Sequence, residues 1–148
     1  MLLYKIKSGA ISSPVNLVSI PSSLTVTYQT NTQVNLGACT LTATFAAGVN
    51  QGDWLPLGVV YDQTSLKAYR YGEEDSTACS GESLTATSVI DLKQGATGVD
   101  ISYAYVYLFS EWLTPGEVLF YSFRKLSRYY VDSVLITGYS FYLRDPNL

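Results

Sequence analysis

Alternation of apolar and polar residues with a period of two is the feature that most limits how this chain can fold. In residues 24–28, Leu24, Val26 and Tyr28 alternate with two threonines, and residues 41–45 repeat the scheme. Successive side chains of a strand point to opposite faces, so this alternation predicts strands with one buried face. Threonine, valine and tyrosine also favour strands because their side chains fit a pleated, half-buried surface.

Similar runs recur along the chain between turn signals. The expected strands are residues 24–28, 41–45, 57–61, 66–71, 84–92, 101–107, 118–123 and 134–143. Helix should be scarce, confined to a short turn at 109–113 or a piece at 124–132. Short strands separated by glycine- and proline-containing turns are typical of β-sandwiches. The sequence therefore predicts an all-β, single-domain fold over residues 1–148, a β-sandwich or jelly-roll-like fold of about 8–9 strands.

Residues 8–52 carry no Asp, Glu, Lys or Arg, although they are not a continuous apolar run. Soluble monomers usually keep charges interspersed over exposed faces, so this stretch indicates a surface that packs against something else. Residues 1–23 could form an extended N-terminal arm, because Ser, Pro and Asn interrupt the aliphatic residues of its second half. The expected partner contacts of such an arm are its apolar side chains: Leu2, Tyr4, Ile6, Val15, Leu17, Val18 and Ile20.

The predicted strand at residues 101–107 is apolar on both faces. Tyr103, Tyr105 and Tyr107 fall on one face, with alanine, valine and leucine on the other. Tyrosine suits interfaces because its ring buries apolar area while its hydroxyl keeps a hydrogen-bond partner. A second sheet would cover one face and another subunit the other, so these tyrosines join the expected partner contacts.

Histidine is absent from the chain, which removes the commonest general base at neutral pH. Histidine-dependent triads and zinc sites are excluded, and two cysteines cannot make a four-thiolate site. We therefore expect no enzymatic activity and no cofactor. A hydrolase would need two carboxylates about 5–10 Å apart, for which Asp53, Glu111, Glu117 and Asp132 are candidates. The acids at residues 73–75 lack the spacing of a calcium loop and are interpreted as a solvated turn.

The net charge of −3, with no basic run longer than two residues, argues against nucleic-acid binding. No segment has the roughly 18 consecutive apolar residues of a membrane span, and no signal-peptide pattern is found. We therefore expect a chain made in the cytoplasm, where Cys39 and Cys79 would stay reduced as small buried thiols. A Cys39–Cys79 bridge is the alternative, expected in a particle exposed outside the cell.

Both tryptophans lie in turn-like segments. Trp54 precedes Pro56, and Trp112 comes shortly before Pro115 and Gly116. If the two rings are exposed, they could stack on sugars, and the protein would be a carbohydrate-binding β-sandwich module. If they are buried, each would instead close one end of the sandwich core.

A short β-rich chain with neutral strands and no catalytic set resembles small structural proteins of tailed-phage virions, such as capsid decoration (cement) proteins and tail or fibre modules. The resemblance implies a virion protein that forms a homo-oligomer, often a trimer, and binds a major capsid or tail protein. Its function would be to stabilise the capsid or tail through protein–protein contacts. The resemblance assigns no role to individual residues.

Overall fold

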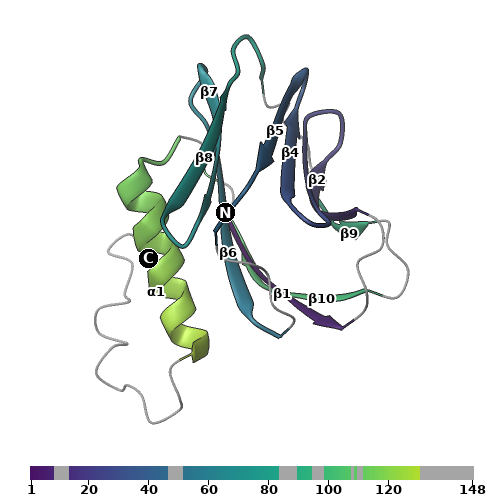
Figure 1. The fold of residues 1–148 in the computed structure, drawn as a ribbon, viewed down its shortest axis with the longest axis vertical. Helices are drawn as coiled ribbons and strands as arrows, with labels where there is room; N and C mark the ends of the chain where they lie inside the picture. The colour runs from purple at the N-terminus through teal and green to yellow at the C-terminus, as the bar shows by residue number, and fades with distance from the viewer. Residues whose placement is uncertain are drawn as a thin grey trace.

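The computed structural model describes residues 1–8, 14–46, 52–83, 90–94, 99–107, 109 and 112–130, and ten strands lie within them. They form two five-stranded antiparallel sheets (Figure 1). The first sheet has the order β10-β1-β6-β7-β8, with bounds β10 (Asp100–Val106), β1 (Leu2–Ser8), β6 (Trp54–Tyr61), β7 (Ser65–Arg70) and β8 (Glu73–Ala78). The second has the order β5-β4-β3-β2-β9, with bounds β5 (Cys39–Ala43), β4 (Thr32–Leu36), β3 (Leu24–Tyr28), β2 (Val15–Ile20) and β9 (Asp91–Gln94). The predicted all-β, sandwich-like fold is confirmed.

Apolar side chains from both sheets fill the space between them. Leu17 and Val34 from the second sheet meet Tyr4 and Leu57 from the first in one buried cluster. Buried residues alternate with more exposed ones along β4 and in β5. The period-two pattern of the sequence therefore produces one continuous core.

The expected N-terminal arm is corrected by this topology. β1 lies inside the first sheet between β10 and β6, and β2 lies inside the second sheet between β3 and β9. The serine, proline and asparagine residues that suggested an arm therefore do not keep these segments out of the sheets. Residues 9–13, between the two strands, lie outside the described residues.

A second correction concerns residues 118–123, which were expected to form a strand. They belong to the helix α1 (Pro115–Tyr130), which covers the outer face of the first sheet (Figure 1). Thr114 caps this helix: its hydroxyl accepts a hydrogen bond from the Glu117 N–H at 3.3 Å, and its own N–H donates to the Glu117 carboxylate at 2.8 Å. This reciprocal pair is a capping box. The expected strand at 134–143 lies outside the described residues, as does most of the one at 84–92.

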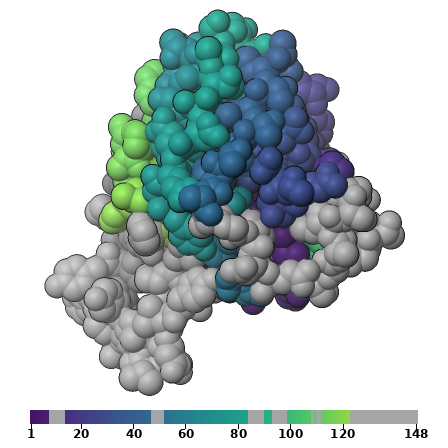
Figure 2. Space-filling model, in the orientation of Figure 1, coloured from purple at the N-terminus to yellow at the C-terminus, as the bar shows by residue number. Residues whose placement is uncertain are grey.

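The edge strands β5 and β8 of the two sheets are joined on one side of the sandwich (Figure 2). A disulfide links Cys39 to Cys79 with a Cα–Cα distance of 5.7 Å. Just beyond the end of β5, the Thr44 N–H donates to the Asp75 carboxylate of β8 at 2.9 Å, and the Ala46 N–H donates to the Glu73 carboxylate at 2.8 Å. The cysteines therefore form the bridge that the sequence left as the alternative.

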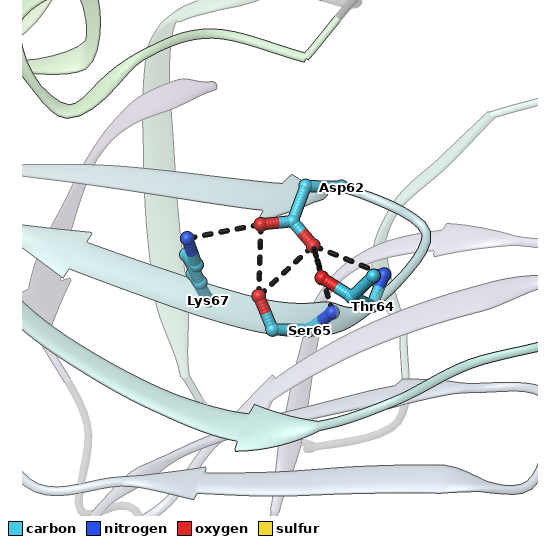
Figure 3. Close-up of polar contacts among 4 residues, drawn as sticks. All are labelled: Asp62, Thr64, Ser65 and Lys67. Carbon is cyan, nitrogen blue, oxygen red and sulfur yellow. Dashed lines mark hydrogen bonds and ion pairs between the residues drawn. The ribbon is translucent and has the colours of Figure 1, made fainter.

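Asp62 organises the turn between β6 and β7 (Figure 3). One carboxylate oxygen accepts the N–H groups of Thr64 at 3.1 Å and Ser65 at 2.7 Å, and the other pairs with the Lys67 ammonium at 2.9 Å. The Lys67 contact first, and then those from Thr64 and Ser65, hold the pKa of Asp62 below its ordinary value. Aspartate favours such turns because its short side chain can bond to the following backbone.

Replacing this carboxylate, Asp62→Asn, is expected to lower the melting temperature at neutral pH. A carboxylate whose folded-state pKa is depressed contributes stability above its unfolded pKa of about 3.9, and that stability is lost as the pH falls toward the folded value. The difference in melting temperature between wild type and variant should therefore narrow below about pH 4. Circular-dichroism melts across this range measure it.

Asp100→Asn is the matched control for this substitution. The side chains of Asp100 and Lys7 are about half exposed, and the Lys7 ammonium lies 3.9 Å from the Asp100 carboxylate. Exposed ion pairs of this kind contribute little to stability. The melting temperature of Asp100→Asn should therefore stay close to that of the wild type at every pH in this range. A difference in melting temperature between wild type and Asp62→Asn that stays constant with pH would contradict the role given to the Asp62 charge.

Candidate functional site: an exposed aromatic surface beside an apolar cavity

A β-bulge in β10 separates the tyrosines that were expected on one face. Tyr105 lies opposite Leu3 of β1, whereas Tyr103 lies opposite Tyr4, with a register shift between the two pairs. Leu3 and Tyr4 are consecutive and point to opposite faces, so the two β10 tyrosines do as well. Tyr103 points into the sandwich, where its hydroxyl donates to the Leu17 carbonyl at 2.7 Å. Tyr105 is directed toward the face that α1 covers.

On that face, aromatic rings form a continuous series. The centroids of Tyr105 and Tyr107 are 5.0 Å apart, and those of Tyr107 and Phe109 are 6.4 Å apart. Tyr121 of α1 lies 5.3 Å from Phe109 and 5.6 Å from Phe120. These distances are typical of favourable aromatic pairs. Rings from β10, from the segment after it and from α1 are therefore packed into one unit.

Much of this aromatic area faces solvent. The exposed fractions are 39% for Tyr107, 40% for Phe109, 57% for Trp112 and 55% for Phe120. We refer to these four residues as the aromatic surface. Since each aromatic side chain presents about 150–250 Å², they expose on the order of 400 Å² together. A patch of this size is comparable to the largest apolar patch of a typical monomer, which often has a function.

A cavity of about 780 Å³ opens beside the aromatic surface. Tyr107, Phe109 and Trp112 line its outer part, and Leu2 and Val26 from the two facing sheets line its inner part. Most of its other lining side chains are aliphatic, and the polar ones are Gln63, Glu82, Ser83 and the tyrosine hydroxyls. Binding cavities commonly combine such a volume with an apolar lining.

The two tryptophans do not form one platform. Trp54 begins β6, half-buried, and the Lys5 ammonium lies 4.7 Å from its ring centre. Trp112 lines the cavity together with Val60, near the opposite end of β6. Val60 is six positions after Trp54 along the strand, a span of about 20 Å. A stacking site for sugars could therefore use Trp112 but not both rings.

The predicted contacts from the N-terminal region are also corrected. Their side chains are buried within the sandwich: Leu2, Tyr4, Ile6, Val15, Leu17, Val18 and Ile20. A partner could not contact them without opening the fold. Of the residues expected to contact a partner, Tyr107 alone lies on the aromatic surface; Tyr103 and Tyr105 are half-buried.

Of the four candidate carboxylates, the structure describes two, and they belong to separate elements of the fold. Glu117 caps α1, and the Thr114 N–H and hydroxyl that bond to it lower its pKa. Asp53 lies immediately before β6, whereas Glu111 and Asp132 fall outside the described residues. The acids at residues 73–75 are in β8 and not in a solvated turn. Within the described ranges, no three acidic or cysteine side chains are grouped as a metal site would require.

A buried arginine was not singled out from the sequence. Arg70 is 4% exposed inside the sandwich; it donates to the Thr32 hydroxyl at 2.8 Å and stacks on Phe45, 4.6 Å from the ring centre. Burial raises the pKa of the neighbouring Tyr4, and the positive charge of Arg70 only partly opposes this rise. No carboxylate in the described part of the chain lies within ion-pair distance of Arg70. It joins β7 to β4 across the core.

The exposed part of the site is neutral and aromatic. From residue 101 to residue 122, Glu117 is the one charged side chain among the described residues, and it is engaged at the helix cap. The helix α1 lacks the length and apolar content needed to cross a membrane, and no other helix is described. Comparison of this chain with protein-family models, with curated proteins and with solved structures finds no match.

Proposed function

We propose that this protein is a non-enzymatic structural protein that stabilises an assembly through protein–protein contacts, as in the virion decoration and tail proteins that its sequence resembles. The observation that supports this is the aromatic surface. Protein interfaces are enriched in tyrosine, tryptophan and phenylalanine and depleted of charge at their centres. The proposed partners are a major capsid or tail protein and further copies of the chain, with no role for nucleic acid or a membrane.

The disulfide supports the same proposal. Disulfides persist in oxidising environments, which include virion surfaces, and are rare in the reducing cytosol. The Cys39–Cys79 bridge joins the edges of the two sheets. A chain that is made in the cytoplasm and then displayed on a particle would acquire this bridge on leaving the cell.

Co-sedimentation with particles purified from the same source tests this function. The wild-type protein should sediment with the particles, and Trp112→Ala combined with Phe120→Ala should weaken binding at least tenfold, because buried aromatic anchors dominate interface energies. Leu92→Ala is the matched control, since Leu92 is an exposed apolar residue of β9 in the other sheet. Equal sedimentation of wild type and double variant would contradict the proposal.

Carbohydrate binding is the second candidate function. The observation that favours it is the 57% exposure of Trp112 beside Tyr107 and Phe109. Trp54 takes no part, because it lies at the other end of β6. If the protein binds carbohydrate, polysaccharide gels should retard the wild-type protein in affinity electrophoresis, and Trp112→Ala should remove this retardation. If the surface serves assembly only, the gels should not retard the wild-type protein.

A further inference from the structure

The aromatic surface and the cavity together resemble the two halves of one contact. At interface hot spots, a protruding aromatic or apolar side chain fills a pocket on the partner. Phe120 protrudes from α1 with 55% of its surface exposed, and it is not part of the cavity wall. The cavity lies beside it, lined by Tyr107, Phe109 and Trp112. One face of this protein therefore carries both an anchor and a pocket.

We propose that the occupant of this face is a second copy of the chain, with Phe120 of each copy entering the cavity of the other. An isologous two-fold contact pairs a surface with itself, so it requires that surface to be self-complementary. A face that carries both an anchor and a pocket meets this requirement. This inference rests on the proposed function: the aromatic surface contacts a second copy, the particle binds the resulting dimer, and variants of this surface weaken particle binding because they break the dimer.

The charge distribution supports a second copy. The whole chain has a net charge of −3, so a contact between two copies is favoured where few charges are free. Among the residues of this face whose side chains are described, the charged ones are Glu82 in the cavity wall and Glu117 at the helix cap, and their carboxylates accept the backbone N–H groups of Ala38 and Thr114. A two-fold contact here would therefore place few like charges against each other, whereas a basic or an acidic partner would find little charge to recognise.

The exposed area also fits this arrangement. The aromatic surface offers on the order of 400 Å², about half of the roughly 800 Å² that each partner contributes to a standard interface. The cavity walls and the polar rim would supply the remainder. A two-fold contact uses the same surface of both copies and leaves none free for a third. It therefore predicts a dimer, in place of the trimer implied by the sequence resemblance.

Sedimentation equilibrium of the purified full chain, over a wide concentration range and without particles, tests the dimer. Wild type should reach twice the 16.2 kDa mass of the chain. Phe120→Ser should raise the dimer Kd by roughly 30-fold or more, the effect of losing one hot-spot anchor. Thr42→Ala should leave the Kd unchanged, because this exposed residue of β5 does not line the cavity. A wild-type monomer at every concentration, a trimer, or an unaltered Kd for Phe120→Ser would each overturn the proposal.

Tryptophan fluorescence gives a second readout that does not depend on the Phe120 variant. In a Trp54→Phe background, Trp112 is the only tryptophan. Its emission should shift to shorter wavelength as the protein concentration rises and the ring leaves water, and a constant spectrum would contradict the dimer. If the protein is a monomer in solution but still sediments with particles, the dimer is refuted and the proposed function is not. If the protein is a dimer but does not sediment with particles, the proposed function is refuted and the dimer is not.

Discussion

Replacing Cys39 and Cys79 by alanine is expected to lower the free energy of unfolding by about 4 kcal/mol. The bridge joins residues 40 positions apart, and the chain-entropy estimate for a loop of this length gives that value. Few single features of a domain of this size could contribute as much, since total stabilities are commonly about 5–15 kcal/mol. Denaturant unfolding of wild type and double variant, compared at equal m-values, measures the difference.

Wild-type protein treated with a thiol reductant is the control for this prediction. Its unfolding midpoint should fall to that of the double alanine variant, because the same bond is removed without changing the sequence. Alanine is used because Cys79 is buried, and a serine hydroxyl there would add a desolvation cost of its own. A double variant as stable as oxidised wild type would show that the bridge does not hold the two sheets together.

Truncating the buried arginine, Arg70→Ala, is expected to cost about 3 kcal/mol of stability. The long side chain fills core volume next to Phe45, so its removal leaves a cavity. The Thr32 hydroxyl, 1% exposed, also loses the donor that satisfies it. Chemical unfolding monitored by circular dichroism gives this value.

Arg70→Met separates packing from charge in this site. Methionine keeps much of the volume and removes a charge whose burial is costly, so its loss of stability should be less than half that of Arg70→Ala. Lys7→Ala, at an exposed position of β1, should change stability little. Equal losses for the methionine and alanine variants would show that the polar contacts of Arg70, and not its volume, stabilise this part of the core.

The strands that the sequence predicts well either alternate in polarity, as β3 does, or form a short apolar run, as β6 does, whereas the alternating strand β4 (Thr32–Leu36) was not predicted. The predicted bounds of β3 agree with the structure, and those of β5, β6, β7 and β10 shift by at most three residues. The strand β8 contains Glu73, Glu74 and Asp75 and was therefore interpreted as a turn. Two of these acids bind backbone N–H groups from beyond the end of β5. Such a partner, about 30 residues away in the chain, gives no local signal.

The helix could have been found by a different reading of its first residues. Thr114 and Glu117 have the capping-box spacing, and proline at the first helical position is a further start signal. The strand propensity of valine and phenylalanine in residues 118–123 outweighed these signals in the sequence-based interpretation. In the structure, α1 packs its apolar side chains against Val60 and Tyr69 of the first sheet, and this tertiary contact stabilises the helix despite the strand propensity of the segment.

The candidate site was only partly predictable for a similar reason. Trp112 and Tyr107 were singled out from the sequence, but Phe120 comes near Phe109 only because α1 places its neighbour Tyr121 against the segment that follows β10. The bulge that separates Tyr103 from Tyr105 depends on the register with β1, which a single strand sequence does not specify. Arg70 gave no signal because its neighbours in the core come from β4 and from Phe45.

The bridge between β5 and β8 also makes the two long sides of the sandwich mechanically unequal. On that side a covalent bond, two carboxylate contacts and the bond from the Ala38 N–H to the Glu82 carboxylate hold the sheets together. At the opposite edges of the two sheets, formed by β10 and β9, a bond from the Tyr103 hydroxyl to the Leu17 carbonyl of β2 joins the sheets without any covalent link among the described residues. Any breathing motion of the sheets should therefore pivot about the disulfide and move β10 and β9 apart most. Slow amide exchange would then be concentrated beside the bridge, and faster exchange in β9 and β10.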